Sequence, residues 1–349
     1  MASTSIKGIR IAGIGTCVPL RRFDNVTETS EFTEDEVKKV VALAGVNARR
    51  LADDSMCSSD LCVAAANKII DSLQWERDSI AALIMVTQSP DYLLPSTSCV
   101  IHKDLELSDK CAAFDVGLGC SGYPYGLWLA AMMLTSGKLR RVLVLHGETP
   151  GRFSDKSDRS VSLLFGDSGS ATALEAIEPD RSEEWFFKLH TDGTGYKDMI
   201  IEAGGFRNRF SDDPQKNFVR MNGANIFNFT IKRVPPLIQD TLALSNMSVD
   251  DIDYFIFHQS NQFIIKHLLK KCKIPGDKVP MTLNEYGNTG GPSIPLTITK
   301  GGIIRPVDKA LKMMLLGYGV GLSWGSVLIN IDPEAIMEHV ELDNDTVHG

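Results

Sequence analysis

Three patterns are missing from this sequence, and each absence excludes a class of protein. Its seven cysteines include no C-x-x-C pair, so the chain lacks the ligand spacing of a zinc site. An odd number of cysteines spread over 349 residues also argues against a disulfide framework and favours a reducing, cytoplasmic setting. Lysine and arginine form no long run and the net charge is -8, so we expect no nucleic-acid binding.

Long apolar runs are absent as well. No stretch of about 18 or more apolar residues is present, so we expect no transmembrane helix and no membrane partner. The first residues, MASTSIKGIRIAGIG, contain neither a long apolar segment nor a cleavage signal of the secretory type. Hydrophobic residues make up 43% and charged residues 23%, which is ordinary for a globular protein long enough for one layered domain or two subdomains.

Short apolar segments alternate with amphipathic ones through the first half of the chain. Strands are predicted over residues 9–13, 81–87, 112–116, 141–145 and 168–177, and helices over 59–73, 96–107 and 121–136. Uniformly apolar strands between helices are typical of a sheet covered on both faces, the α/β layered class. Hairpins and loops are expected over 181–218, followed by a helix over 221–244 that is interrupted or bent at Pro235 and Pro236.

The second half contains a short echo of the first. The segment LIMVTQS (Leu83–Ser89) aligns with YFIFHQS (Tyr254–Ser260), and each follows a predicted helix and an Asp-containing turn. A duplicated α/β unit would leave such a trace. We therefore predict two similar halves, residues 1–180 and 181–349, that share one continuous core.

The stretch DVGLGCSGYPYG allows two interpretations. Gly117, Gly119 and Gly122 spell G-x-G-x-x-G between a strand and a helix, the fingerprint of a dinucleotide-binding loop. The acid expected about 20 residues further on is not cleanly present, because Glu148 arrives late, and Pro124 falls inside the first turns of the helix. An NAD(P)-dependent oxidoreductase is thus the alternative from another enzyme class.

The same turn presents Cys120 at the start of a helix, where the positive end of the helix dipole favours a thiolate over a thiol. Small neighbours would let a substrate approach the sulfur closely. The competing interpretation is a buried structural cysteine, which is the commoner role for this residue type. The strand–turn–helix setting favours a nucleophile about as strongly as the residue type argues against one.

Three later segments carry candidates for the same chemistry. His258 ends a strand in FHQSNQ, Asn288 lies in the Gly- and Pro-rich loop EYGNTGGPSIP, and Gly319 lies in the glycine-rich LLGYGVGLSWGSVLI. A histidine at a strand end can enter a cleft, a loop amide can donate to an oxyanion, and glycine lets a backbone N–H face a ligand. Each also has a purely structural interpretation, as a satisfied histidine, a turn asparagine or a hairpin glycine.

Taken in chain order, these motifs resemble the β-ketoacyl-acyl-carrier-protein synthase III family of the thiolase-like superfamily. The order is a cysteine elbow, G-D-S-G-x-A, H-Q-x-N, Y-G-N-T-x-x-x-S-I-P and G-x-G-x-x-W-G-S, and it covers nearly the whole chain. The resemblance implies a five-layered αβαβα fold of two similar halves, a homodimer, and a catalytic triad of Cys120, His258 and Asn288.

The resemblance also implies a reaction: an acyl-Cys enzyme forms from an acyl thioester and condenses, with loss of CO2, with a malonyl-type thioester. Acyl-CoA or an acyl carrier protein would be the substrate and partner, with no cofactor or metal. The backbone N–H groups of Cys120 and Val320 would form the oxyanion hole. Four further residues would contact substrate: Leu94, Phe263, Tyr318 and Gly319.

Several positions depart from the pattern of the family's housekeeping members. Lys39 and Leu43 stand where a Trp and an Arg usually contact coenzyme A, and Phe263 replaces an Arg that helps to dock the carrier protein. Val320 replaces a Gly, and Leu94 is the residue before the proline of the dimer-crossing loop. We therefore expect a divergent member with an unusual acyl group, in secondary metabolism. The sequence leaves open the identity of the acyl chain, the acceptor and the carrier. It also leaves open two other functions: acyl transfer to an oxygen or nitrogen nucleophile without condensation, and a non-catalytic acyl-binding role.

Overall fold

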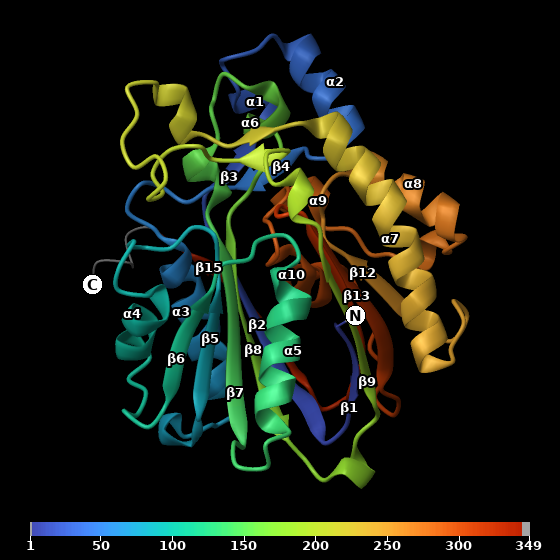
Figure 1. Ribbon diagram of the computed structural model, residues 1–349. Coiled ribbons are helices and arrows are strands. Elements are labelled where there is room, and N and C mark those ends of the chain that lie inside the picture. The colour runs from blue at the N-terminus through green and yellow to red at the C-terminus, as the bar shows by residue number, and fades with distance from the viewer. Residues whose placement is uncertain (1, 344–349) are drawn as a thin grey trace.

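The computed structural model describes residues 2–343 and contains two stacked β-sheets (Figure 1). The six-stranded sheet has the order β15-β2-β8-β7-β5-β6, and the five-stranded sheet has the order β1-β9-β14-β13-β12. The first is formed by β15 (Ile336–Leu342), β2 (Ile9–Pro19), β8 (Ser168–Ala176), β7 (Arg141–Glu148), β5 (Ala82–Val86) and β6 (Ala112–Val116). The second is formed by β1 (Ala2–Ile6), β9 (Trp185–Thr191), β14 (Ser323–Ile331), β13 (Leu311–Gly319) and β12 (Tyr254–Phe257).

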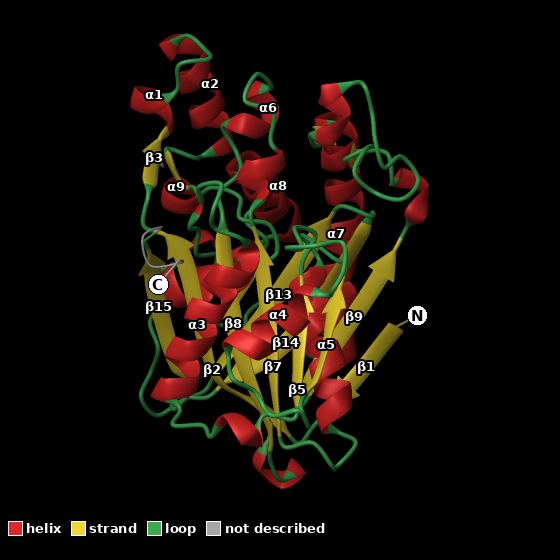
Figure 2. Cartoon of the chain, turned by 90° about the vertical axis from the view of Figure 1, so that its left-hand side faces the viewer, coloured by secondary structure: helices red, strands yellow, loops and turns green. Residues whose placement is uncertain are grey.

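Helices complete a five-layered αβαβα sandwich (Figures 1 and 2). The outer helices on the six-stranded sheet are α3 (Ser58–Ser72) and α4 (Thr97–Asp104), and those on the five-stranded sheet are α7 (Gly223–Ser245) and α8 (Gln262–Cys272). Between the sheets lie α5 (Gly122–Leu134) and α10 (Ser293–Lys300), which contact strands of both. This confirms the predicted fold class.

The central helical layer is held by apolar side chains from both sheets. Leu127 of α5 and Ile298 of α10 pack in one buried cluster with Val144 of β7 and Leu315 of β13. A helix buried on all sides needs no polar face, and only Met132 of the apolar residues on α5 is largely exposed. One buried cluster therefore joins strands of both sheets through the central helices.

Smaller elements cover the end of the sandwich where the strands β5, β6 and β12 finish. They are β3 (Arg22–Asp24), α1 (Asn25–Glu28), α2 (Glu34–Ala44), β4 (Ala48–Arg50), α6 (Arg159–Ser162), β10 (Met199–Ile200), β11 (Arg220–Met221) and α9 (Leu283–Tyr286). Single 3-10 turns occur at 77–79, 150–153, 179–181, 193–195, 214–217 and 276–278. Ligands of α/β sheets bind outside the carboxyl ends of strands, so this end is where a site is expected.

The predicted elements are confirmed in kind, with boundaries that shift by a few residues. The largest differences are β2, which continues to Pro19, and β9, a full strand within the region predicted as hairpins and loops. The predicted interruption of the helix at Pro235 and Pro236 is wrong, because α7 runs continuously through both prolines. Val234 and Leu237 beside them are fully buried, and this packing outweighs the lost backbone hydrogen bonds.

The predicted division near residue 180 falls between β8 and β9, where the chain passes from one sheet to the other. Two strands cross that division: β1 pairs with β9 of the second sheet, and β15 pairs with β2 of the first. Within residues 2–343, no helix is long and apolar enough to cross a membrane.

Candidate active site

A cavity of about 130 Å³ lies where the two halves meet at this end of the sandwich. It brings together Cys120, which follows β6, His258, which follows β12, and Asn288, from the loop between α9 and α10. Its lining consists of Cys120, Leu164, Phe165, Met199, Met221, Gly223, Ile226, Thr230, His258, Ser260, Asn261, Ile264, Asn288, Tyr318 and Gly319. Three side chains from distant sequence segments thus converge on one acyl-sized, largely apolar space.

The glycines around Cys120 serve packing rather than phosphate binding. A Cβ on Gly119 would collide with the side chain of Gln88, and one on Gly122 would lie 2.9 Å from Cε1 of His146. A pyrophosphate needs open space over such glycines, and protein atoms fill it at Gly119 and Gly122, although not at Gly117. The dinucleotide interpretation of the loop therefore fails on geometry.

The thiol of Cys120 is buried, and its ionisation differs from the prediction. Burial raises the pKa of Cys120 to about 11, although hydrogen bonds from the backbone N–H groups of Val320 and Cys120 itself act in the opposite direction. The expectation that the helix start favours the thiolate is thus wrong for Cys120, because desolvation outweighs the helix dipole.

This ionisation has a measurable consequence. In the free protein, alkylation of Cys120 by iodoacetamide is expected to accelerate about tenfold per pH unit from neutral pH upward, since the thiolate fraction rises until the pH reaches the pKa near 11. The rate is followed by mass spectrometry of the Cys120 peptide. A rate that levels off near pH 7 would show instead that the thiolate is already present.

His258 is held by two contacts at its Nδ1. Its Nδ1 lies 2.9 Å from the carbonyl oxygen of Gly290 and 3.0 Å from Oγ of Ser293. Burial lowers the pKa of His258 to about 4, so the ring is neutral at pH 7. In the tautomer that donates Nδ1–H to the Gly290 carbonyl, Nε2 carries no proton and is available as a base.

Asn288 is held by contacts at both ends of its amide. Its Oδ1 accepts the N–H of Gly290 at 3.0 Å, and its Nδ2 donates to the carbonyl of Ser260 at 3.3 Å. Its backbone N–H donates to Leu164, and its carbonyl accepts the N–H of Gly166, so a bridge to Phe165 fixes the loop. The second hydrogen on Nδ2 is then left as a donor in the cavity.

Tyr318 and Gly319, at the end of β13, line the cavity beside His258 and Cys120. The hydroxyl of Tyr318 donates to the carbonyl of His258 at 3.2 Å, and its ring meets the imidazole edge-on. A Cβ on Gly319 would lie 2.7 Å from Cβ and 2.9 Å from Sγ of Cys120. Tyr318 therefore supports the histidine, and the missing side chain of Gly319 makes room for the sulfur.

Replacing Gly319 by alanine is expected to slow alkylation of Cys120 by at least about tenfold, because the new methyl group occupies the approach to the sulfur. The matched control is Gly193→Ala, where an added Cβ meets nothing within 4 Å. Circular dichroism separates a blocked sulfur from an unfolded chain. Equal alkylation rates in the folded Gly319→Ala protein would contradict this packing.

Two predicted substrate contacts lie outside this cavity. Leu94 is 78% exposed, and Phe263 is 47% exposed on α8, where it stacks on Phe227 with ring centroids 5.6 Å apart. Asn261 and Ile264, which are close to Phe263 in the sequence, line the cavity, whereas Phe263 does not. The single chain therefore does not bring Leu94 or Phe263 to the cysteine.

Other residues of the site have no chemical signal in the sequence. Ile226 and Thr230 of α7 line the cavity, but their spacing of four residues is that of any helix face.

Glu148 is buried and accepts hydrogen bonds from the N–H of Gln88 and the hydroxyl of Ser89, and burial raises its pKa to about 8. Its carboxylate therefore holds the loop after β5, and it does not serve as the acid that would bind the ribose of a dinucleotide.

This arrangement, with a cysteine from one half and a histidine and an asparagine from the other, defines the thiolase-like class of acyl-transferring enzymes. The family model described as 3-oxoacyl-[acyl-carrier-protein (ACP)] synthase III matches residues 114–193, and the model of its C-terminal part matches residues 242–331. The chain belongs to the 3-oxoacyl-[acyl-carrier-protein] synthase III family of condensing enzymes.

Individual relatives agree over almost the whole chain. The crystal structure of a 3-oxoacyl-(acyl-carrier protein) synthase from Burkholderia xenovorans LB400 is similar with a TM-score of 0.93 and 40% identity, covering 97% of this chain and 99% of that chain. A β-ketoacyl-[acyl-carrier-protein] synthase III of Syntrophomonas wolfei is 31% identical over 326 residues, which is 92% of this chain and 97% of that protein. The priming β-ketosynthase of the R1128 polyketide pathway is 25% identical with a TM-score of 0.83, covering 94% of this chain and 98% of that chain.

Proposed function

We propose that Cys120 accepts an acyl group from acyl-CoA or an acyl carrier protein and that the enzyme condenses this group with a malonyl-type thioester. The observation that carries the proposal is the convergence of Cys120, His258 and Asn288 on one cavity. The two halves divide the work, since residues 1–180 supply the nucleophile and residues 181–349 supply the other two groups. The enzyme works in the cytoplasm and uses no cofactor beyond its thioester substrates.

In the first half-reaction, the sulfur of Cys120 attacks the thioester carbon while Nε2 of His258 takes the thiol proton. The N–H groups of Cys120 and Val320, which both act to lower the pKa of the Cys120 thiol, stabilise the oxyanion that develops. The bond from carbon to the first carrier's sulfur then breaks, and the departing thiolate takes a proton from water. The acyl group remains on Cys120.

In the second half-reaction, the malonyl-type thioester loses CO2 and its electrons form an enolate. The Nδ2–H of Asn288 and the protonated Nε2 of His258 donate hydrogen bonds to the enolate oxygen. The carbanion attacks the acyl carbon, a carbon–carbon bond forms, and the thioester bond to Cys120 breaks. The released Cys120 thiolate recovers its proton from His258, so the enzyme returns to its starting state.

The donor specificity follows from the rim of the site. Leu43 is 57% exposed and Phe263 is 47% exposed, at two of the positions where the housekeeping pattern places a basic side chain. Apolar side chains cannot pair with phosphate groups of coenzyme A or with acidic residues of a carrier protein. We propose that this member accepts an unusual acyl donor, in secondary metabolism.

Intact-protein mass spectrometry after incubation with a panel of acyl-CoA and acyl-carrier-protein thioesters tests the first half-reaction. The expected result is one acyl adduct per chain, mapped after digestion to Cys120 and not to Cys99, the exposed cysteine. Release of CO2 from malonyl thioester that depends on the adduct tests condensation. An adduct that passes to an oxygen or nitrogen nucleophile without CO2 release would support simple acyl transfer instead.

We also propose that two copies of the chain form a dimer along β6. This strand is the edge of the six-stranded sheet, with no partner on its outer side among the described residues, and an unpaired edge is a natural pairing surface. Tyr92, Leu93 and Leu94 on the neighbouring loop are 59%, 60% and 78% exposed. A partner chain would cover these side chains. Leu94 of one chain would then lie toward the acyl cavity of the other chain.

The variant Leu94→Asp is expected to weaken this dimer, since a buried unpaired carboxylate at the contact is costly. The measurement is the molar mass by light scattering after size exclusion, over a range of protein concentrations. The control is Val307→Asp, at a 93% exposed apolar residue remote from β6 in sequence. A wild-type protein that is monomeric at all concentrations would contradict the proposed dimer.

A further inference from the structure

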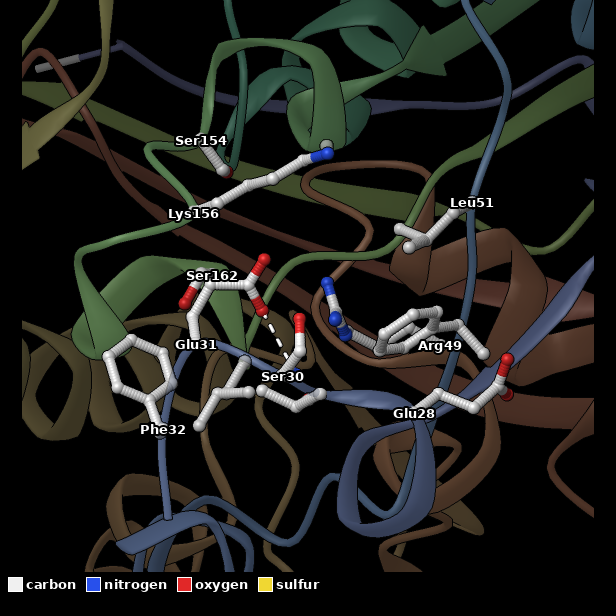
Figure 3. Close-up of a pocket in the computed structure, with 13 residues that line it drawn as sticks. Glu28, Ser30, Glu31, Phe32, Arg49, Leu51, Ser154, Lys156 and Ser162 are labelled. Carbon is white, nitrogen blue, oxygen red and sulfur yellow. Dashed lines mark hydrogen bonds between the residues drawn. The ribbon is translucent and has the colours of Figure 1, made fainter.

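Figure 3 shows a second cavity, of about 280 Å³. It shares no lining residue with the acyl cavity, but Leu163 of its lining is followed in the chain by Leu164, which lines the acyl cavity. It is formed by the segment after α1, the strand β4 and the segment that leads into α6. Its lining consists of Phe23, Glu28, Thr29, Ser30, Glu31, Phe32, Arg49, Leu51, Gly151, Ser154, Lys156, Ser162 and Leu163. We call it the Arg49 cavity, and no step of the condensation uses it.

Arg49 is a buried cation that forms no direct ion pair with any described residue, although Asp167 and Glu31 act on it electrostatically. Its Nε donates to Oδ1 of Asn25 at 2.7 Å, its Nη1 donates to the carbonyl of Phe165 at 3.2 Å, and its guanidinium lies over the ring of Phe23. Among residues 2–343, no carboxylate lies within 4 Å of it and Nη2 has no hydrogen-bond partner. Figure 3 shows the guanidinium directed into the cavity, so its spare N–H groups face open space.

Buried hydroxyl groups around the cavity also lack partners. Oγ1 of Thr29 and Oγ of Ser162 are buried and form no hydrogen bond within the described part of the chain. Native proteins pair nearly all such groups, so several unpaired groups around one cavity indicate that a ligand completes them. Lys156 lies across the cavity from Arg49 and adds a second cation (Figure 3).

The charges select the kind of ligand. Glu28 is already bound by Arg21 and by the N–H of Asp24, and Glu31 accepts the N–H of Ser30 and lies within electrostatic reach of Lys156. Asp167 and Glu31 also act electrostatically on Arg49, but neither forms an ion pair with its guanidinium, so its Nη2 is left as a donor. A monoanion meets less repulsion from these carboxylates than a phosphate dianion would.

We propose that the Arg49 cavity is a second ligand site and binds a small organic carboxylate. The planar guanidinium matches a carboxylate with two parallel hydrogen bonds, and the hydroxyls of Thr29 and Ser162 complete its coordination. Phe32, Leu51 and Leu163 offer apolar contact to a short carbon chain. Arg49 itself donates to the carbonyl of Phe165, whose backbone pairs with Asn288.

Isothermal titration calorimetry with sodium propionate tests the site, on full-length protein whose Cys120 has first been carbamidomethylated to occupy the acyl cavity. The expected result is one propionate per chain, with propionamide and inorganic phosphate binding at least ten times more weakly. Ser162→Phe, which fills the cavity, should abolish binding. Lys156→Ala should weaken it about fivefold, the scale of one partly solvated charge. Lys138→Ala, at an exposed residue between α5 and β7 that does not line the cavity, should leave it unchanged.

Three results would overturn the site: no binding of propionate, equal binding of propionamide, or undiminished binding in a folded Ser162→Phe protein. If Ser162→Phe does not fold, Lys156→Ala still tests the site, because Lys156 is exposed and its removal should not disturb the fold. An unchanged propionate affinity in Lys156→Ala would also reject the proposal. Condensation is assayed separately and does not depend on the outcome, so failure here would leave the proposed function standing.

Discussion

The variant Cys120→Ala is expected to form no acyl adduct and to lose condensation by at least about 10³-fold, because no other group in the acyl cavity can hold the acyl chain. Slow decarboxylation of the malonyl thioester should persist, since His258 and Asn288 remain in place. The measurements are the adduct mass and the rates of CO2 release and of 3-oxoacyl product formation.

The matched control for this variant is Cys99→Ala, which removes an exposed cysteine from α4 and should leave both rates unchanged. The alanine at 120 removes a single buried sulfur atom, so the fold is expected to persist and the thermal transition to stay close to that of the wild type. Condensation at a wild-type rate in Cys120→Ala would reject covalent catalysis at this residue.

The second large effect separates the roles of Asn288 and His258. Asn288→Ala should lower condensation by about 10²–10³-fold, the scale for loss of one oxyanion donor, while acylation of Cys120 stays near the wild-type rate. His258→Ala should lower both rates, because Nε2 removes the thiol proton in the first step and donates to the enolate in the second. Single-turnover measurements of adduct formation and of CO2 release separate the two steps.

Two further variants keep this comparison interpretable. Ser260→Ala removes only a side-chain hydroxyl beside the carbonyl that binds Asn288, so it should retain both rates within a few fold. Ser293→Ala removes one hydrogen-bond partner of Nδ1 in His258 and leaves the Gly290 carbonyl, so it should change the pH dependence of acylation more than its maximum. Equal losses of both half-reactions in Asn288→Ala would show that the asparagine is needed to shape the cavity and not to stabilise the enolate.

Much of the fold follows from local pattern. The uniformly apolar segments at 81–87 and 141–145 become β5 and β7, both buried on their two faces, because a covered parallel sheet requires that pattern. The short echo between Leu83–Ser89 and Tyr254–Ser260 marks strands that each pair in parallel with a neighbour in their own sheet. Cys120 and His258 each follow a strand, and the carboxyl ends of both strands lie at the edge where the cavity forms. Asn288 lies between two helices, so only the resemblance to the family links it to the other two.

The remaining features depend on packing between distant segments, and no window of sequence contains them. The pKa of Cys120 rises and the ring of His258 stays neutral because both halves of the molecule exclude water from them. α7 continues through Pro235 because its neighbours are buried against the five-stranded sheet, and Leu94 is exposed because the loop that carries it projects from the single chain. The unpaired guanidinium of Arg49 is visible only once Asn25, Phe23 and Phe165 surround it.

Residue order and spacing thus specify which groups do chemistry and which strands carry them, since periodicity and turn residues act over a few positions. Charge state, accessibility and the second cavity are decided by the tertiary structure, because desolvation and pairing depend on contacts between residues that are a hundred or more positions apart.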